Sequence, residues 1–140
     1  MPRNNYLLSG EPSENLIQTT VIEWCRLHPL LKYIVIHIPN EGKRSPRYGR
    51  HLKAMGMIPG VFDLFIASAK EPYIGAWIEL KSFHGKLTPA QKEFGTNMNQ
   101  QGYFTAVCRS VDEAINTIKW YMQFKKEPHS LVLLAEVSYP

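Results

Sequence analysis

The chain has 140 residues, of which 44% are hydrophobic and 20% are charged, and its net charge is +4. A chain of this length and composition can bury a core within one domain, without disulfides or metals to staple it. Its two cysteines, Cys25 and Cys108, lack metal-ligand spacing. No apolar run approaches the roughly 20 residues that span a membrane, which excludes a membrane protein, and nothing indicates a disulfide scaffold. We therefore expect a soluble intracellular protein with reduced cysteines.

The first predicted elements are a helix and a short strand. Residues 12–28 place apolar side chains three to four positions apart, and Pro29 ends that pattern. Residues 33–39 are rich in β-branched side chains and stop at a proline, which predicts a strand. A basic segment follows, and a short helix is expected near residues 47–55.

Two apolar strands are predicted in the middle of the chain. A turn at Pro59 and Gly60 introduces the first, residues 61–67, and residues 73–80 form the second. Because side chains alternate along a strand, the second strand has two unlike faces. One face carries Ile74, Ala76, Ile78 and Leu80, and the other carries Gly75, Trp77, Glu79 and Lys81.

Helices and strands alternate in the C-terminal half. Thr88 suits the N-cap of a helix, and Gln91 suits the third position of its capping box. Residues 102–108 are predicted as a strand, and residues 110–124 as an amphipathic helix. The tail, residues 128–140, is expected to add a strand or to form a dimer contact.

Together the elements predict an α/β protein with the order α-β-β-β-α-β-α. This order is typical of a mixed central sheet of four to five strands flanked by helices. We expect a single domain over residues 1–140, with its core at about residues 13–122.

Positive charge gathers between the first two predicted strands. Residues 43–53, KRSPRYGRHLK, hold five Lys or Arg and no acid, whereas the rest of the chain is nearly neutral. Such a cluster can neutralise phosphates and release their condensed counterions. The candidate nucleic-acid contacts are Asn40, Lys43, Arg44, Arg47, Arg50 and Lys53. A solvated basic loop is the alternative interpretation.

Two carboxylates of the middle strands are candidates for chemistry. Asp63 is predicted inside the 61–67 strand and Glu79 inside the next one, and a buried carboxylate is costly unless it is paired or holds a metal. Acids on adjacent strands can converge on Mg²⁺, which prefers oxygen ligands. Lys81 can neutralise such a pair and polarise a water. The alternatives are an ion pair of Glu79 with Lys81 at a strand end and a turn acid at Asp63.

These residues carry a resemblance to known nucleases. Pro59-Gly60, Asp63 and Glu79-Leu80-Lys81 resemble the signature of the PD-(D/E)XK nuclease superfamily. Six segments in order resemble, more narrowly, the VRR-NUC domain: SENLIQTTVIEW, PNEG, GMIPGVFDLFI, YIGAWIELK, GKLTPAQKEF and GYFTAVCRSVDEAINTI. The resemblance spans about residues 13–122 and implies a restriction-endonuclease-like sheet.

The resemblance also implies a role for each matching position. The implied catalytic residues are Glu14, Asp63, Glu79, Lys81 and Gln91, and the implied metal ligands are Glu14, Asp63, Glu79 and the backbone carbonyl of Leu80. From the residues alone, Glu14 equally suits a first-turn acid that the helix dipole favours. Gln91 equally suits a capping residue, and we expect that it cannot serve the cap and the site fully at once.

The implied function is Mg²⁺- or Mn²⁺-dependent hydrolysis of DNA, with no small-molecule cofactor. Stand-alone proteins of this family and size resemble Holliday-junction resolvases of replication and repair, so branched or junction DNA is the expected partner. Symmetrical cutting of a four-way junction needs two active sites, which predicts a homodimer. We expect it in the cytoplasm of a bacterial or phage-infected cell. A flap, nick or single-strand nuclease and a non-catalytic DNA-binding module are the alternatives.

Overall fold

The computed structural model describes residues 10–39, 45–126 and 131–133, with side chains as far as Phe124. The elements in chain order are α2 (Glu14–Leu27), α3 (Leu31–Ile34), β1 (Val35–His37), α4 (Pro46–Ala54), β2 (Leu64–Ile66), β3 (Ala76–Leu80), α5 (Pro89–Gln100), β4 (Phe104–Cys108), α6 (Val111–Tyr121), β5 (Phe124–Lys126) and β6 (Leu131–Leu133). Four strands form one sheet in the order β1-β2-β3-β4. The first two pairs are antiparallel and β3 and β4 are parallel, which confirms the predicted mixed α/β sheet.

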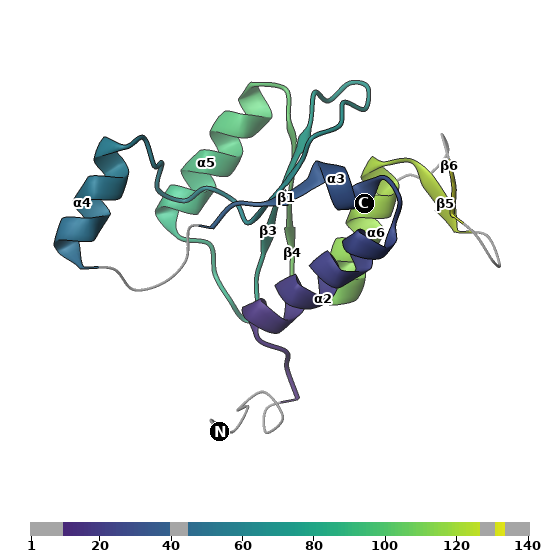
Figure 1. Ribbon diagram of the computed structural model, residues 1–140, viewed down its shortest axis with the longest axis horizontal. Coiled ribbons are helices and arrows are strands. Elements are labelled where there is room, and N and C mark those ends of the chain that lie inside the picture. Colours follow the sequence, from purple (N-terminus) through teal and green to yellow (C-terminus); the bar gives the residue numbers. More distant parts are fainter. Residues whose placement is uncertain (1–9, 40–44, 127–130, 134–140) are drawn as a thin grey trace.

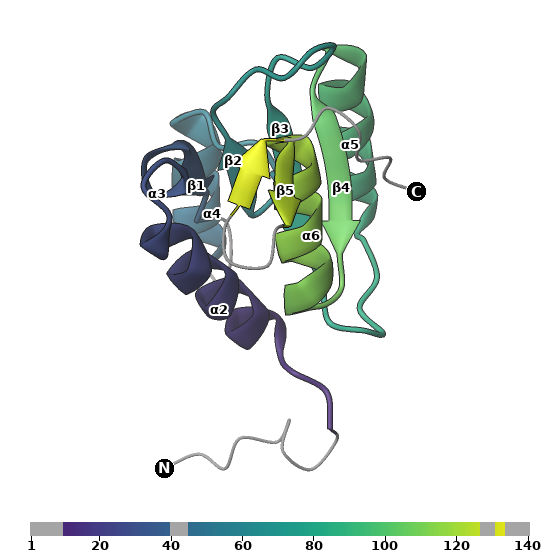
Figure 2. The ribbon, with the colours of Figure 1, turned by 90° about the vertical axis from the view of Figure 1, so that its right-hand side faces the viewer.

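Helices cover both faces of this sheet (Figure 1). α2 and α6 lie on one face and α5 lies on the other, whereas α4 stands apart at one side of the molecule. A second view shows β4 at the edge of the sheet with α5 beside it, and β5 and the yellow β6 in front of α6 (Figure 2). The site described below lies on the α5 side.

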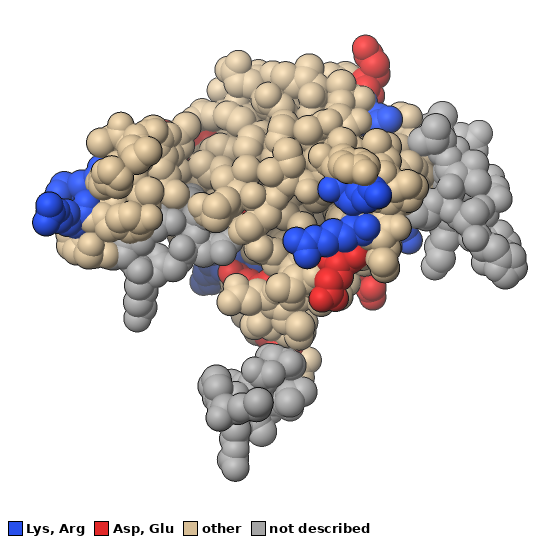
Figure 3. All heavy atoms as spheres, viewed as in Figure 1, with Lys and Arg blue, Asp and Glu red and all other residues tan. Residues whose placement is uncertain are grey.

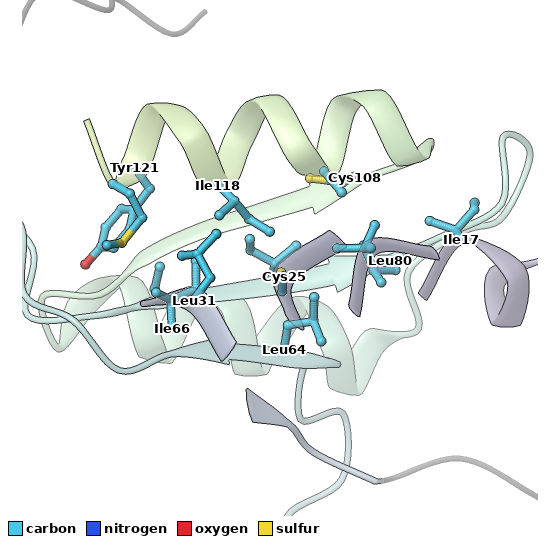
Figure 4. Packing of buried hydrophobic residues seen from close by; sticks show 14 of the residues in the cluster. Ile17, Cys25, Leu31, Leu64, Ile66, Leu80, Cys108, Ile118 and Tyr121 are labelled. Carbon is cyan, nitrogen blue, oxygen red and sulfur yellow. The ribbon is translucent and has the colours of Figure 1, made fainter. Parts of the chain in front are cut away.

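The hydrophobic core fills the space between the sheet and the α2–α6 layer (Figure 4). Its buried members include Ile17, Val21, Cys25, Leu31, Leu64, Ile66, Ile78, Leu80, Cys108 and Ile118. Full burial of one such Ile or Leu side chain stabilises the fold by about 1.5–3 kcal/mol. Both cysteines are free, as predicted, and burial raises the pKa of Cys25 to about 12 and that of Cys108 to about 11.

The two faces of β3 serve different purposes, as their alternation predicts. The core face carries Ala76, Ile78 and Leu80, which are at most 1% exposed. On the other face, Trp77 packs under α5 against Phe65 and Phe94, with ring centroids 4.6 and 5.0 Å away. These aromatic contacts pack the β3 segment that carries Glu79 against α5.

The region around β1 differs from the sequence prediction. Leu31–Ile34 form the short helix α3, so β1 begins at Val35 and the strand predicted over residues 33–39 is wrong at its start. The ring nitrogen Nδ1 of His28 accepts hydrogen bonds from the backbone N–H groups of Leu30 and Leu31, at 3.1 and 3.2 Å. Leu31 is fully buried, so this capped turn and its core contact override the β-branched composition.

Two strand predictions also need correction. β2 begins at Leu64, so Asp63 immediately precedes the strand and is not inside it. β6 is a strand, as expected for the tail, but it pairs with β5 in a separate two-stranded sheet and does not extend the central one. Residues 128–130 and 134–140 of the tail lie outside the described residues.

Candidate active site

Asp63 and Glu79 face each other where β2 meets β3. The register that pairs Phe65 with Trp77 places these two acids opposite one another. The backbone N–H of Asp63 donates to Glu79 Oε2 at 3.2 Å, and the backbone N–H of Leu80 donates to Asp63 Oδ2 at 2.8 Å. Each carboxylate is therefore oriented by a backbone donor that the sheet holds in place.

Glu79 is almost completely buried, with 2% of its surface exposed. Its Oε1 atom accepts a 2.6 Å hydrogen bond from Gln91 Nε2 and lies 3.6 Å from the ammonium nitrogen of Lys81. Burial, and next the charge of Asp63, raise the pKa of the Glu79 carboxyl to about 8, although Lys81 opposes the rise. Because one lysine does not offset burial and a second acid, the site favours an additional cation.

Gln91 serves the helix and the site with the two ends of one amide. Its Oε1 accepts from the backbone N–H of Thr88 at 2.9 Å, and Thr88 Oγ1 accepts from the backbone N–H of Gln91 at 3.1 Å. This confirms the predicted capping box of α5. The amide nitrogen remains for Glu79, because an amide carries its acceptor and its donors on different atoms. The expectation that the two tasks compete for this side chain is wrong.

One cavity brings the predicted catalytic residues together. It has a volume of about 370 Å³, and its walls include Glu14, Asp63, Glu79, Lys81 and Gln91. Lys81 follows β3 and is 8% exposed. Glu14 belongs to the first turn of α2, and its Oε1 atom accepts from the backbone N–H of Ser82 at 3.4 Å. The first helix and the sheet thus meet at this cavity.

The basic segment reaches the cavity through α4, the short helix that the sequence predicts near residues 47–55. Ser45 caps its N-terminus, accepting from the backbone N–H of Tyr48 at 3.1 Å. Gly49 and Lys53, four residues apart on one face of α4, line the cavity. Lys53 therefore shares the walls of this cavity with the acid pair.

The other candidate contacts of the basic segment either do not line the cavity or lie outside the described residues. Arg47 precedes Gly49 by two residues, about 200° of helical rotation, so it leaves α4 from nearly the opposite side. Lys and Arg side chains of α4 project at the left edge of Figure 3. Asn40, Lys43 and Arg44 lie outside the described residues.

Arg109, which follows β4, is a residue that the sequence analysis missed. Its Nη1 atom donates to the carbonyl oxygens of Ser82, at 3.2 Å, and of Gly85. Gly85 in turn lies against Glu14, since a Cβ atom added there would be 3.0 Å from Glu14 Oε1. Arg109 thus anchors the turn that supports Glu14. No local pattern signals this contact, because its partners are 24 and 27 residues away in the chain.

The donor atoms of the cavity suit a hard cation that keeps part of its water. Among the residues that the structure describes, no three His, Cys, Asp or Glu side chains are grouped to hold a metal by themselves. Asp63 and Glu79 offer two facing carboxylates, and Leu80 adds a backbone carbonyl between Glu79 and Lys81. Mg²⁺ is commonly held by one or two carboxylates and several waters. The residues present therefore fit a hydrated Mg²⁺ or Mn²⁺ ion.

The comparison with solved structures decides the family. A structure described as a "VRR_NUC domain protein" matches with a TM-score of 0.69 and 30% sequence identity, over 80% of this chain and 89% of that chain. The chain belongs to the VRR-NUC family. No family model and no curated protein matches it. Membership in the VRR-NUC family confirms the predicted restriction-endonuclease-like fold and indicates a nuclease.

Within residues 10–39, 45–126 and 131–133, no helix has the length and apolar character that crossing a bilayer requires.

Proposed function

We propose that this VRR-NUC chain is a DNA endonuclease that hydrolyses phosphodiester bonds with Mg²⁺ or Mn²⁺ and prefers branched or four-way junction DNA. The observation that carries the proposal is the pairing of the half-buried Asp63 with the buried Glu79, with Lys81 3.6 Å from Glu79 in the same cavity. A simple ion pair at a strand end does not require a second acid facing the buried carboxylate. A metal-assisted hydrolytic site does.

The side chains of the cavity divide the work of hydrolysis. A divalent ion, when bound, supplies a water of lowered pKa and positive charge beside the scissile phosphate. Asp63, Glu79 and the Leu80 carbonyl would hold that ion. Lys81 would orient the attacking water and stabilise negative charge that develops on the phosphate. Family chemistry implies products with 5′-phosphate and 3′-hydroxyl ends.

Two further side chains support this arrangement. Gln91 fixes the orientation of Glu79 through the 2.6 Å hydrogen bond to Oε1. Glu14 adds a third carboxylate at the edge of the cavity, where the proposal gives it the role of completing the acidic cluster. Lys53 lies on the α4 side, where it can contact a phosphate of the incoming DNA.

The test compares variants of the site with a control in the same loop. Glu79→Gln and Lys81→Met should each lower Mn²⁺-dependent cleavage of a labelled four-way junction by about 100-fold or more, the usual contribution of such groups. Binding of the same DNA in EDTA should persist. Lys86→Met removes an exposed lysine five residues beyond Lys81 and should cut normally.

Different substrates and outcomes separate the alternatives. Junctions, flaps, nicked duplexes and single strands are assayed side by side with the wild-type protein. Cleavage of flaps alone removes the junction preference. Binding without cleavage of any substrate supports a non-catalytic DNA-binding module, and full activity of either site variant refutes the mechanism.

A further inference from the structure

A second, larger hollow lies next to the catalytic cavity, between α5 and the outer edge of β4. Its volume is about 660 Å³, within the range of ligand-binding clefts. On α5 it is lined by Gln91, Lys92, Gly95, Thr96, Asn99 and Gln100. These positions repeat at intervals of four residues, so they form one continuous face of the helix. We call this hollow the α5–β4 groove.

The α5–β4 groove continues directly from the active site. Gln91 lines both hollows, and its amide nitrogen binds Glu79. Val107, on the β4 wall of the groove, is the register partner of Glu79 in the parallel pair of β3 and β4. Partner residues on adjacent strands lie about 4.8 Å apart, so the groove begins one strand beyond the proposed metal ligand.

The chemistry of the groove walls suits a phosphate backbone. Of the described residues that line it, Lys92 alone is charged, and the others include the amides of Asn99 and Gln100 and the hydroxyls of Thr96 and Thr105. All of these groups can donate hydrogen bonds to phosphate or sugar oxygens. The lining contains no carboxylate that would repel an anion.

The same walls offer little to a nucleobase. The one aromatic residue among the described lining is Phe62, which is 2% exposed and packs against Phe94. Base recognition on a single strand relies on exposed aromatic faces. The contacts available here therefore favour binding that does not depend on sequence.

The groove is long enough for a short stretch of sugar–phosphate backbone. Gln91 and Asn99 are eight residues apart on α5, about 12 Å along the helix axis. Successive phosphates of one strand are farther apart than the roughly 3.4 Å axial rise of B-DNA, because a whole sugar–phosphate unit joins them. A strand whose scissile phosphate sits at Asp63 and Glu79 would thus place its next phosphates along α5.

From this geometry we infer that the α5–β4 groove binds the sugar–phosphate backbone of the cleaved strand on one side of the cut. This inference rests on the proposed function and adds to it a binding surface next to the catalytic cavity, on the α5 and β4 side of Gln91. The groove holds the strand by phosphate and sugar contacts, and the cavity beyond Gln91 cleaves it.

The experiment uses adjacent residues on different faces of α5. Thr96→Glu places a negative charge in the groove, and Asn97→Glu places the same charge outside it, because Asn97 lines a separate hollow with Phe94 and Met98. Both positions are exposed, so both variants should fold. Lys92→Ala removes the lysine of the groove, and Lys32→Ala removes an exposed lysine of α3 as its control.

Each variant is assayed for kcat and KM on a junction at several salt concentrations. Thr96→Glu should raise KM about tenfold at low salt while kcat changes little, because loss of a hydrogen bond to a charged group costs about that factor. Lys92→Ala should reduce the slope of log affinity against log salt by about 0.7–0.9, the value for one phosphate contact. Both controls should behave as the wild-type protein does.

Truncated substrates then locate the contact. Removing nucleotides stepwise from one side of the mapped cut should abolish the difference between Thr96→Glu and Asn97→Glu, whereas removing them from the other side should not. Equal KM values for these two variants on the full junction overturn the inference but leave the proposed function standing. A wild-type protein that cleaves no DNA refutes the proposed function and the inference with it.

Sedimentation velocity without DNA tests whether the groove instead binds a second copy of the chain. The Thr96→Glu protein should form an assembly of the same number of chains as the wild-type protein. A change in mass with an unchanged KM would show that the groove binds a second copy of the chain, and the inference would be wrong.

Discussion

The buried carboxyl of Glu79 links the stability of the metal-free protein to pH. Its pKa rises from 4.5 to about 8 on folding, mainly because burial disfavours the charged form. Between these values the folded protein binds more protons than the unfolded chain, so stability falls as pH rises. The stabilising contribution is complete below about 4.5 and is lost as pH passes about 8.

Thermal unfolding in EDTA tests this link at the level of one residue. The melting temperature of the wild-type protein should fall across this pH range, and Glu79→Gln should remove much of the fall because an amide does not ionise. Glu93→Gln, at an exposed position of α5, is the control and should keep the wild-type slope. An equal slope in Glu79→Gln and the wild-type protein would mean that Glu79 titrates normally.

Single residues differ in how far the sequence reveals their task. The facing of Glu79 and Lys81 follows from the alternation of one strand, so a local pattern is enough to predict it. The double use of Gln91 could not be predicted, because it depends on where α5 lies relative to β3. Arg109 is similar, since its value comes from carbonyl groups of a distant turn.

At the scale of elements, the turn between β3 and α5 connects the site to the first helix. Arg109 binds two carbonyls of this turn, and Gly85 leaves space for the Glu14 carboxylate. An added Cβ at Gly85 would lie 2.9 Å from Ser82 Oγ and 3.0 Å from Glu14 Oε1. Both contacts are with the ends of side chains, so Gly85→Ala should fold and displace Glu14.

A double-mutant cycle measures this displacement. Gly85→Ala should lower cleavage in the wild-type background, and it should have little further effect in Glu14→Ala, because the affected carboxylate is then absent. Cleavage rates of the two single variants and the double variant provide the measurement. If the two effects simply multiply, Gly85 does not act through Glu14.

For helix α4, we expect the effect of a substitution on DNA binding to depend on which face of the helix carries the residue, and not only on the charge that is removed. Lys53 lines the catalytic cavity, whereas Arg47 leaves the helix about 120° away from Lys53 and does not line the cavity. Lys53→Ala should therefore weaken junction binding and lower its salt dependence by about one phosphate contact. Arg47→Ala removes the same charge and should have a smaller effect on both. Equal effects in titrations at several salt concentrations would indicate that α4 acts only through its overall charge.

The sequence predicts the elements with local signals better than those decided by packing. The capping box of α5 is such a short pattern and occurs as predicted, and the helix predicted over residues 110–124 occurs as α6, with Ser110 as its N-cap. Helix α3 and the pairing of β5 with β6 do not follow such patterns. α3 depends on Leu31 entering the core, and β6 depends on a partner strand after α6 that the amphipathic pattern of residues 110–124 conceals.

At the scale of the whole molecule, the part of the chain that the structure describes has one pair of facing acids in its catalytic cavity, at one end of the β2–β3 ladder. Symmetrical cutting of a four-way junction requires two such sites related by a two-fold axis. The proposed junction activity therefore requires two copies of the chain on each junction, and sedimentation with and without DNA should detect a dimer.

Mixed dimers test whether the two sites act separately. Wild-type and Glu79→Gln chains, tagged differently and purified together, would give dimers with one intact acid pair. Because each cavity is built from residues of one chain, such a dimer should nick one strand of a junction while failing to cut the second. A plasmid with an extruded cruciform distinguishes these products, since one cut relaxes the circle and paired cuts make it linear. Linear product from mixed dimers at the wild-type rate would show that one site cuts both strands. If wild-type dimers only nick the plasmid and never make it linear, that result would argue against junction resolution.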